Sequence, residues 1–264
     1  YDRGAIAPGK RADLVVFADL LDIRPELVFC GGSLVAEDSD PVGDWPEPTV
    51  DLNPVRDTIH VDCDSLGERT FRVPAQGSRA RVIGVIENQA VTNHLVEEIP
   101  QDNGRALTDV ERDILKITVI ERHLGTGNVG RGFIQGFGLK SGALATSVAN
   151  DHHNIVVVGV DDQSMYAAAR AVGEMGGGFA VANKDQVMAR VAFPVAGLMS
   201  DQSAEAVKDA METLQRSAVA LGSKLHDPFM TLGFMALEVI PTLKLTDQGL
   251  IDVEKFKHVE LFVE

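Results

Sequence analysis

The sequence predicts an α+β protein, because its two halves differ in character. In the first half, short β-prone runs alternate with turns rich in glycine and proline. In the second half, an apolar strand at residues 154–159 precedes two segments of helical periodicity, with a strand pair between them. The order β-α-β-β-α is built most economically as a domain of two packed layers.

The N-terminal stretch predicts a small sheet followed by a linker. Residues 14–17 form an apolar strand, and residues 26–30 and 33–36 flank a glycine pair, which is typical of a hairpin. Residues 41–54 hold four prolines and Trp45 and are expected to be irregular. We therefore divide the chain into residues 1–42, a linker over 43–57, and a C-terminal domain over 58–264.

The middle of the chain predicts a strand-rich region. Residues 109–113 are short and charged, which is typical of a turn or a brief helix. The expected strands are residues 58–61, 70–73, 79–87, 117–122, 132–139 and 143–148.

The second half supplies the helices. Asp161 and Asp162 are expected to cap a helix that ends at the glycines 176–178. Residues 179–182 and 187–193 follow as a hairpin. Ser200 and Asp201 are expected to cap a second helix that runs to about Gly222.

Composition excludes several classes of protein. The chain has 264 residues, 45% of them hydrophobic and 24% charged, as in a globular protein. A net charge of -15 without a basic cluster argues against binding to nucleic acid or an anionic membrane. Two cysteines, no signal peptide and no apolar run of membrane-spanning length favour a cytoplasmic location.

The densest polar run is residues 150–154, directly before the apolar strand. Its Asp151, His152 and His153 could bind a divalent metal or transfer a proton. However, adjacent histidines on an extended chain point to opposite faces, so one metal does not easily take both. The alternative is a loop in which Asp151 and Asn154 satisfy backbone groups, with one histidine packed and one solvated.

Two further segments have structural explanations. The glycine-rich residues 125–132 resemble a phosphate loop, but a strand rather than a helix is expected after them, which disfavours a nucleotide site. Ser200 and Asp201 need no role beyond helix capping unless residues 195–199 face a pocket. The sequence contains no nucleophile elbow, Cys-x-x-Cys pair or His-Glu-x-x-His motif.

Several segments together resemble the C-terminal region of bacterial adenine deaminases, members of the amidohydrolase superfamily. The opening GAIAPGKRADLVV resembles the superfamily segment that returns from the catalytic barrel to a small β-domain. The other matching segments are residues 138–160, 194–207 and 227–253. In these enzymes the histidine run usually reads His-Asp-Ser-His-Asn, whereas Asn150 stands here in place of the first histidine.

The resemblance implies hydrolytic deamination of adenine to hypoxanthine and ammonia, in purine salvage. It implies a metal-activated hydroxide, with manganese or iron, or else zinc, held in a barrel by a His-x-His pair and further ligands. This chain has no His-x-His pair and no eightfold strand–helix alternation, and it begins at Tyr1. We therefore expect a partial β-sandwich and an α+β domain that brace or cover a barrel outside the chain, which alone would be inactive.

Candidate residues at the mouth of that barrel are few, and we assign no catalytic residue within this chain. They are Asp151, His153, Asn154, Ser200 and Asp201, with His152 and His153 as weak metal candidates. The expected partners are adenine, the barrel and a second copy of the chain. The alternatives are a free-standing binding or assembly module and the tail of another amidohydrolase, such as a dihydroorotase or imidazolonepropionase.

Overall fold

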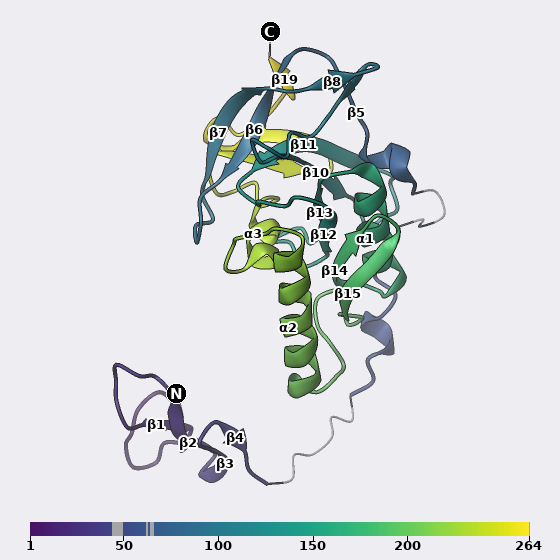
Figure 1. The fold of residues 1–264 in the computed structure, drawn as a ribbon. Coiled ribbons are helices and arrows are strands. Elements are labelled where there is room, and N and C mark those ends of the chain that lie inside the picture. The colour runs from purple at the N-terminus through teal and green to yellow at the C-terminus, as the bar shows by residue number, and fades with distance from the viewer. Residues whose placement is uncertain (44–49, 62, 64–65, 264) are drawn as a thin grey trace. The chain divides into compact units, whose positions relative to one another are not determined.

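The chain folds into two compact units, residues Tyr1–Asp51 and Leu52–Glu264 (Figure 1). The computed structural model describes residues 1–43, 50–61, 63 and 66–263. Part of the expected linker, residues 44–49 with Trp45, lies outside the described residues. The 3₁₀ helix η1 (Asn53–Val55) falls within the linker's second part.

The first unit is a four-stranded antiparallel sheet in the order β1-β2-β3-β4. Its strands are β1 (Leu14–Phe17), β2 (Pro25–Cys30), β3 (Ser33–Glu37) and β4 (Asp40–Pro41). Gly31 and Gly32 make the β2–β3 turn with φ angles of 59° and 88°, which glycine adopts without strain, so the predicted hairpin is confirmed. None of residues 1–43 is buried.

The second unit is built on a nine-stranded mixed sheet in the order β15-β14-β12-β13-β10-β11-β6-β19, with β7 paired to β6. The pairs are antiparallel except β11 with β6. The strands are β6 (Arg79–Val85), β7 (Thr92–Glu98), β10 (Ile114–Ile120), β11 (Val129–Gln135), β12 (Ala143–Thr146), β13 (Ile155–Gly159), β14 (Gly178–Asn183), β15 (Gln186–Ala192) and β19 (Phe262–Val263). All residues of β10, β12 and β13 are buried, and for β13 this confirms the prediction from the apolar run at residues 154–159.

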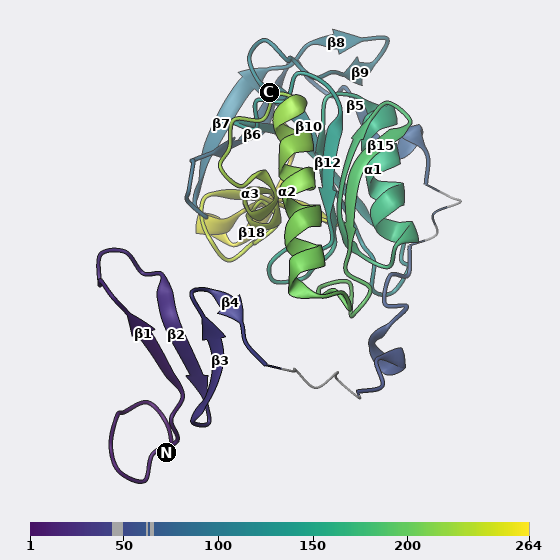
Figure 2. The ribbon, with the colours of Figure 1, turned by 60° about the horizontal axis from the view of Figure 1, so that its bottom comes forward.

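Helices cover both faces of this sheet. Helix α1 (Asp162–Glu174) packs on the face that carries Ile155 and Val157, while α2 (Ala204–Ala220) and α3 (Pro228–Phe234) pack on the face that carries Val156 and Val158. Alternate side chains of one strand therefore enter two different cores. Figure 2 shows α1 and α2 on opposite sides of these strands. The α+β class is confirmed.

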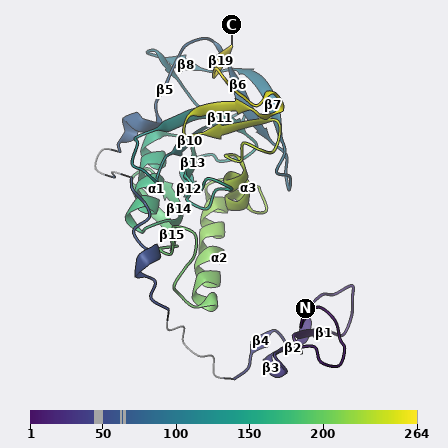
Figure 3. The ribbon, with the colours of Figure 1, turned by 180° about the vertical axis from the view of Figure 1, so that it is seen from behind.

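Two small sheets complete the unit. Strands β16 (Leu243–Thr246), β17 (Gly249–Asp252) and β18 (Lys257–Val259) form one, which lies against β11 (Figures 1 and 3). Strands β5 (Val73–Pro74), β9 (Arg105–Ala106) and β8 (Gln101–Asp102) form the other. The 3₁₀ helices η2 (Glu68–Phe71) and η3 (Val253–Lys255) join these elements. Among the described residues, no helix is both long and apolar enough to cross a membrane.

Of the two predicted helix caps, one is confirmed and one is wrong. Asp161 caps α1, because its carboxylate accepts from the amide of Ser164 at 2.9 Å. The prediction that Ser200 or Asp201 caps the second helix is wrong, because α2 starts at Ala204 and its cap is Ser203. Residues 195 and 199 form an isolated bridge, so the chain is still turning at Ser200.

Several predicted strands also differ from the structure. Residues 58–61 form no strand, and residues 70–73 contain the end of η2 and the start of β5. Strand β7 was missed because its polar side chains weaken the apolar signal. Asp227 caps α3, because its carboxylate accepts from the amides of Phe229 and Met230 ahead of a first-turn proline.

Candidate functional site

The histidine run at residues 150–154 and the loop at residues 194–201 meet at one buried arginine. Arg122 follows β10 and is 2% exposed. Its Nε donates to the carbonyl of His153, and its Nη2 donates to the carbonyl of Ala196 at 3.1 Å. Its Nη1 reaches the carbonyl and hydroxyl oxygens of Thr58, each at 3.3 Å. One guanidinium therefore joins three segments that are distant in sequence.

The absence of a side chain at Gly197 leaves room for the guanidinium. A Cβ at Gly197, whose φ is 71°, would lie 2.6 Å from Nη1 of Arg122. The same loop is held from behind by Ser147, whose hydroxyl donates to the carbonyl of Gly197 at 2.6 Å and accepts from the amide of Gly178 at 2.8 Å. The 194–201 loop thus has little freedom next to Arg122.

His152 is a structural residue in this arrangement. Its Nε2 lies 2.7 Å from the carbonyl oxygen of Ala236, which can only accept, and its Nδ1 lies 3.2 Å from the amide of Asn154, which can only donate. With these partners, the neutral ring carries its proton on Nε2. The carboxylate of Glu238 is farther from Nε2, at 3.7 Å.

Asn154 links the histidine loop to the turn between β16 and β17. It is 3% exposed, and its Oδ1 accepts from the amide of Arg122 at 3.3 Å. Its Nδ2 donates to Asp247 at 3.2 Å, and Asn128 donates to the other oxygen of the same carboxylate at 3.3 Å. Both polar atoms of Asn154 are used, so its side chain is committed to the fold.

His153 differs from its neighbours because its ring has no hydrogen bond within the part of the chain that the structure describes. The residue adopts φ 51°, and its amide donates to the carbonyl of Ala149 at 2.6 Å. The ring's Nδ1 is buried without a partner among the described residues. Burial lowers the pKa of His153, and the positive charge of Arg122 lowers it further, which favours the neutral imidazole near pH 7. Of the residues singled out in the run, His153 has the ring that is available to another group.

The remaining predicted residues lie at the surface or serve the local structure. Asp151 is exposed. Ser200 accepts from the amide of Gln202 at 3.1 Å. Asp201 pairs with Arg56 at 2.6 Å, and hydrogen bonds from Gln202 and Arg56 lower the pKa of its carboxyl. The expected place of these residues at the mouth of a barrel outside the chain stays a prediction.

The donor set does not fit a divalent metal. Both ring nitrogens of His152 are engaged, which removes one of the two imidazoles that a metal would need. Across the described ranges, no three His, Cys, Asp or Glu side chains lie close enough to share an ion.

The glycine-rich segment forms a turn around an acidic side chain. Burial alone would raise the pKa of Glu121, but hydrogen bonds from the amides of Thr126, Leu124 and His123 outweigh it and lower the pKa to about 2. Gly130 is needed for close packing, because a Cβ there would lie 1.8 Å from the carbonyl oxygen of Thr246. A strand, β11, follows, so the glycines serve packing and the turn.

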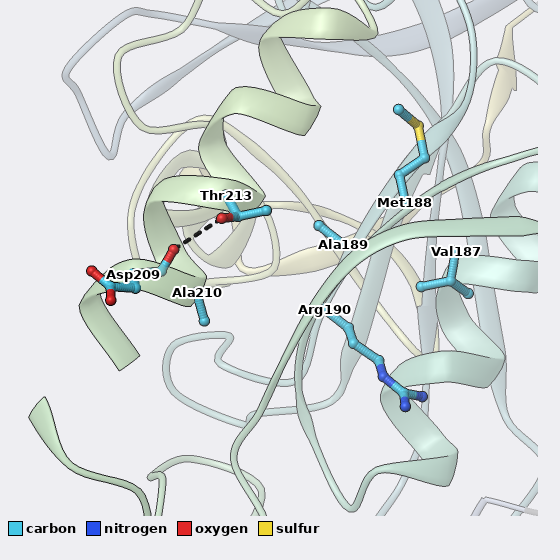
Figure 4. A pocket seen from close by; sticks show the side chains of 7 residues that line it. All are labelled: Val187, Met188, Ala189, Arg190, Asp209, Ala210 and Thr213. Atoms are coloured by element: carbon cyan, nitrogen blue, oxygen red, sulfur yellow. Dashed lines mark hydrogen bonds between the residues drawn. The ribbon is translucent and has the colours of Figure 1, made fainter. Parts of the chain in front are cut away.

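A groove of about 630 Å³ lies between α2 and β15, away from the residues that surround Arg122. Figure 4 shows its lining, in which the apolar side chains of β15 are bordered by Arg190 and by residues of α2. The lining residues are Val187, Met188, Ala189, Arg190, Asp209, Ala210 and Thr213. None of them belongs to the polar segments discussed above.

Comparison with known proteins places the chain in a family. Residues 89–257 match the family described as the adenine deaminase C-terminal domain. The chain belongs to this family. The adenine deaminase of Desulfatibacillum aliphaticivorans is 49% identical over 261 residues, which are 99% of this chain and 45% of the relative. Adenine deaminase 2 of Carboxydothermus hydrogenoformans is 46% identical over 98% of this chain and 45% of its own length.

A third relative, the adenine deaminase of Methanothrix thermoacetophila, is 43% identical over 99% of this chain and again 45% of its own length. The chain thus spans less than half the length of these curated relatives. The resemblance to adenine deaminase C-terminal regions is confirmed.

Sequence reasoning missed Arg122, the residue that organises this adenine deaminase C-terminal domain around its histidine loop. A signal was present: Glu121 and Arg122 are adjacent charged residues directly after an apolar strand that is buried on both faces. Charges in such a position are costly unless they have partners, which marks them as members of a hydrogen-bonded network.

Proposed function

We propose that this chain is the C-terminal part of an adenine deaminase, which hydrolyses adenine to hypoxanthine and ammonia in purine salvage. The observation that carries the proposal is the identity of 49% over 99% of the chain to a protein named adenine deaminase. In this proposal, the catalytic barrel and its divalent metal (manganese, iron or zinc) belong to the rest of the protein. The chain braces or covers that barrel.

The first unit supports a bracing role. None of residues 1–43 is buried, and apolar side chains such as Val15 (51% exposed) and Val16 (38% exposed) remain uncovered in this unit. A sheet this small, without a core, does not stabilise itself. We propose that further strands of the same β-domain, supplied by the rest of the protein, cover it.

The second unit supports placement of the histidine loop at the barrel mouth. Of the candidate residues, we assign contact with the substrate or with the barrel to His153, whose ring has no hydrogen-bond partner among the described residues. Asp151 lies beside it at the surface. Asn154, Ser200 and Asp201 hold the loops in place. We also propose that the enzyme is cytoplasmic and that it forms a homo-oligomer. Size-exclusion chromatography with light scattering tests the oligomeric state.

The test of the function compares the full-length protein with the 264-residue chain. Both are assayed for conversion of adenine to hypoxanthine by absorbance, with added Mn²⁺ or Fe²⁺. We expect turnover by the full-length protein and none by the chain. Turnover by the chain alone would show that the catalytic centre lies within it. An inactive full-length protein with either metal would favour a free-standing binding module or another amidohydrolase activity.

The test of the site uses His153→Ala in the full-length protein. Loss of a hydrogen bond to substrate or barrel should lower kcat/KM by about tenfold or more. His94→Ala is the matched control, because His94 is also a half-buried histidine whose pKa is lowered by burial, and it lies on β7. Equal kcat/KM values for the two variants would show that His153 does not lie at the mouth of the barrel.

A further inference from the structure

We infer that Arg122 is a positioning residue, which holds the histidine loop and the 194–201 loop in one fixed arrangement and so sets the place of His153. The inference deepens the proposed function and rests on it wherever adenine turnover is the measurement. We place Arg122 in contact with neither a substrate nor a metal. It acts through the backbone of His153, the residue that we assign to contact with the substrate or the barrel.

The first argument is geometric. The guanidinium donates to the carbonyls of His153 and Ala196, so it bridges the two loops directly. The backbone of Arg122 adds a second connection on each side: its amide donates to the side chain of Asn154 at 3.3 Å, and its carbonyl accepts from the amide of His60 at 2.7 Å. The arginine is thus the common point of the loops on which the candidate residues lie.

The second argument is chemical. Among the described residues, the guanidinium of Arg122 donates only to carbonyl and hydroxyl oxygens, and no carboxylate pairs with it. A planar guanidinium presents donors in several fixed directions, which a lysine ammonium cannot reproduce. Burial lowers the pKa of Arg122, so the protein retains this cation at a cost in stability. Retention at a cost is reasonable where three segments need one rigid junction.

The third argument concerns what the junction does to His153. The charged or titratable groups that influence its imidazole are Arg122, His152, Asp151 and His123. Arg122 is the permanent cation of this set, and its charge opposes protonation of the ring. The same residue therefore fixes the backbone beneath His153 and favours the neutral ring.

The test uses the full-length protein with three substitutions. Arg122→Lys keeps the charge and removes the fork, and Arg122→Gln removes both. Gly197→Ala leaves the arginine in place but forces its guanidinium to move, because the new Cβ would lie 2.6 Å from Nη1. The matched control is Arg131→Lys, since Arg131 also has a burial-lowered pKa and donates to backbone carbonyls, those of Thr70 at 2.6 Å and Val129 at 3.3 Å.

The first readout is the rate at which diethyl pyrocarbonate modifies His153, measured by peptide mass spectrometry across pH. It does not depend on adenine turnover. We expect faster modification in Arg122→Lys and Gly197→Ala, and a higher pKa of His153 in Arg122→Gln than in Arg122→Lys. The second readout is kinetics, in which kcat should fall by about tenfold to a hundredfold while KM changes less, as for a misplaced group.

The outcomes separate the inference from the proposed function. If Arg122→Lys and Arg131→Lys give the same modification rate of His153, Arg122 is only a stabilising buried arginine and the inference is wrong. If His153 reactivity changes while adenine kinetics do not, Arg122 positions the loop but the loop is not at the mouth. If Arg122→Lys does not fold, Gly197→Ala decides by the same comparison.

Discussion

Replacing Lys244 should make the stability of this protein respond differently to pH. Lys244 is fully buried in β16, and its Nζ donates to the carbonyls of Ala90 at 2.6 Å and Phe234 at 2.9 Å. No carboxylate pairs with it among the described residues. Burial lowers the pKa of Lys244 from 10.5 to about 8, because the charged form loses its hydration.

The magnitude follows from proton linkage. The folded pKa lies below the unfolded one, so below pH 8 both states hold the proton and the native state bears the full cost of about 3 kcal/mol. Between pH 8 and 10.5 the native state loses its proton first, and the cost fades as the pH rises. From pH 7 to pH 9.5 the contribution of Lys244 should improve by about 2 kcal/mol.

The assay is urea unfolding of the wild type and Lys244→Met at pH 7 and pH 9.5. Methionine fills the space of the lysine stem without a titrating group, although it leaves two carbonyls without a donor. The change in the difference between the two proteins is therefore more informative than its value at one pH. The wild type should gain about 2 kcal/mol on the variant as the pH rises. Lys208→Met, at an exposed position of α2, controls for loss of positive charge. A difference that stays constant with pH would refute the reasoning.

Three further substitutions test other parts of the fold by the same unfolding measurement. Glu121→Gln should lower the free energy of unfolding by about 3 kcal/mol at pH 7, since the pKa of Glu121 is lowered to about 2 in the native state. The difference between the two proteins should vanish as the pH falls from 4.5 towards 2. A difference that persists at pH 2 would contradict a lowered pKa of Glu121. Gly130→Ala should prevent stable folding, because a Cβ would lie 1.8 Å from the carbonyl oxygen of Thr246, the last residue of β16. Gly127→Ala is the control, since Gly127 has open space around it and φ 76°, and it should lower the free energy of unfolding by only about 1 to 2 kcal/mol. Similar losses of stability in the two variants would contradict the close packing at Gly130. Ser203→Ala should destabilise α2 by about 1 kcal/mol and Ser200→Ala by less, and the reverse order would restore the sequence-based cap.

Sequence reasoning succeeded where one local signal determines the structure. The buried strand β13, the hairpin at Gly31 and the cap at Asp161 were each predicted from a few neighbouring residues. The start of α2 was not, because Ser200 and Ser203 are equally good caps by residue type. The turn bridged by residues 195 and 199 and the ion pair of Asp201 with the distant Arg56 belong to the loop that precedes α2, and no local pattern indicates that ion pair.

The site could be predicted less well, because its geometry depends on contacts between distant residues. No local pattern pairs Arg122 with Ala196, which is 74 residues away, or Asn154 with Asp247, which is 93 residues away. The polar run at residues 150–154 was therefore visible as a cluster of functional types, but the division of labour within it was not. That division is set by which atoms find partners across the fold.

This division bears on the departure from the usual His-Asp-Ser-His-Asn pattern. Asn150 stands in place of the first histidine, and His152 stands in place of the serine, so the run keeps two imidazoles. His152 does not offer a free nitrogen in place of the missing ring, because its Nε2 donates to Ala236 and its Nδ1 accepts from Asn154. Coordinating a metal would require breaking one of these two hydrogen bonds. Any chemistry that this loop provides therefore rests on a single imidazole, that of His153.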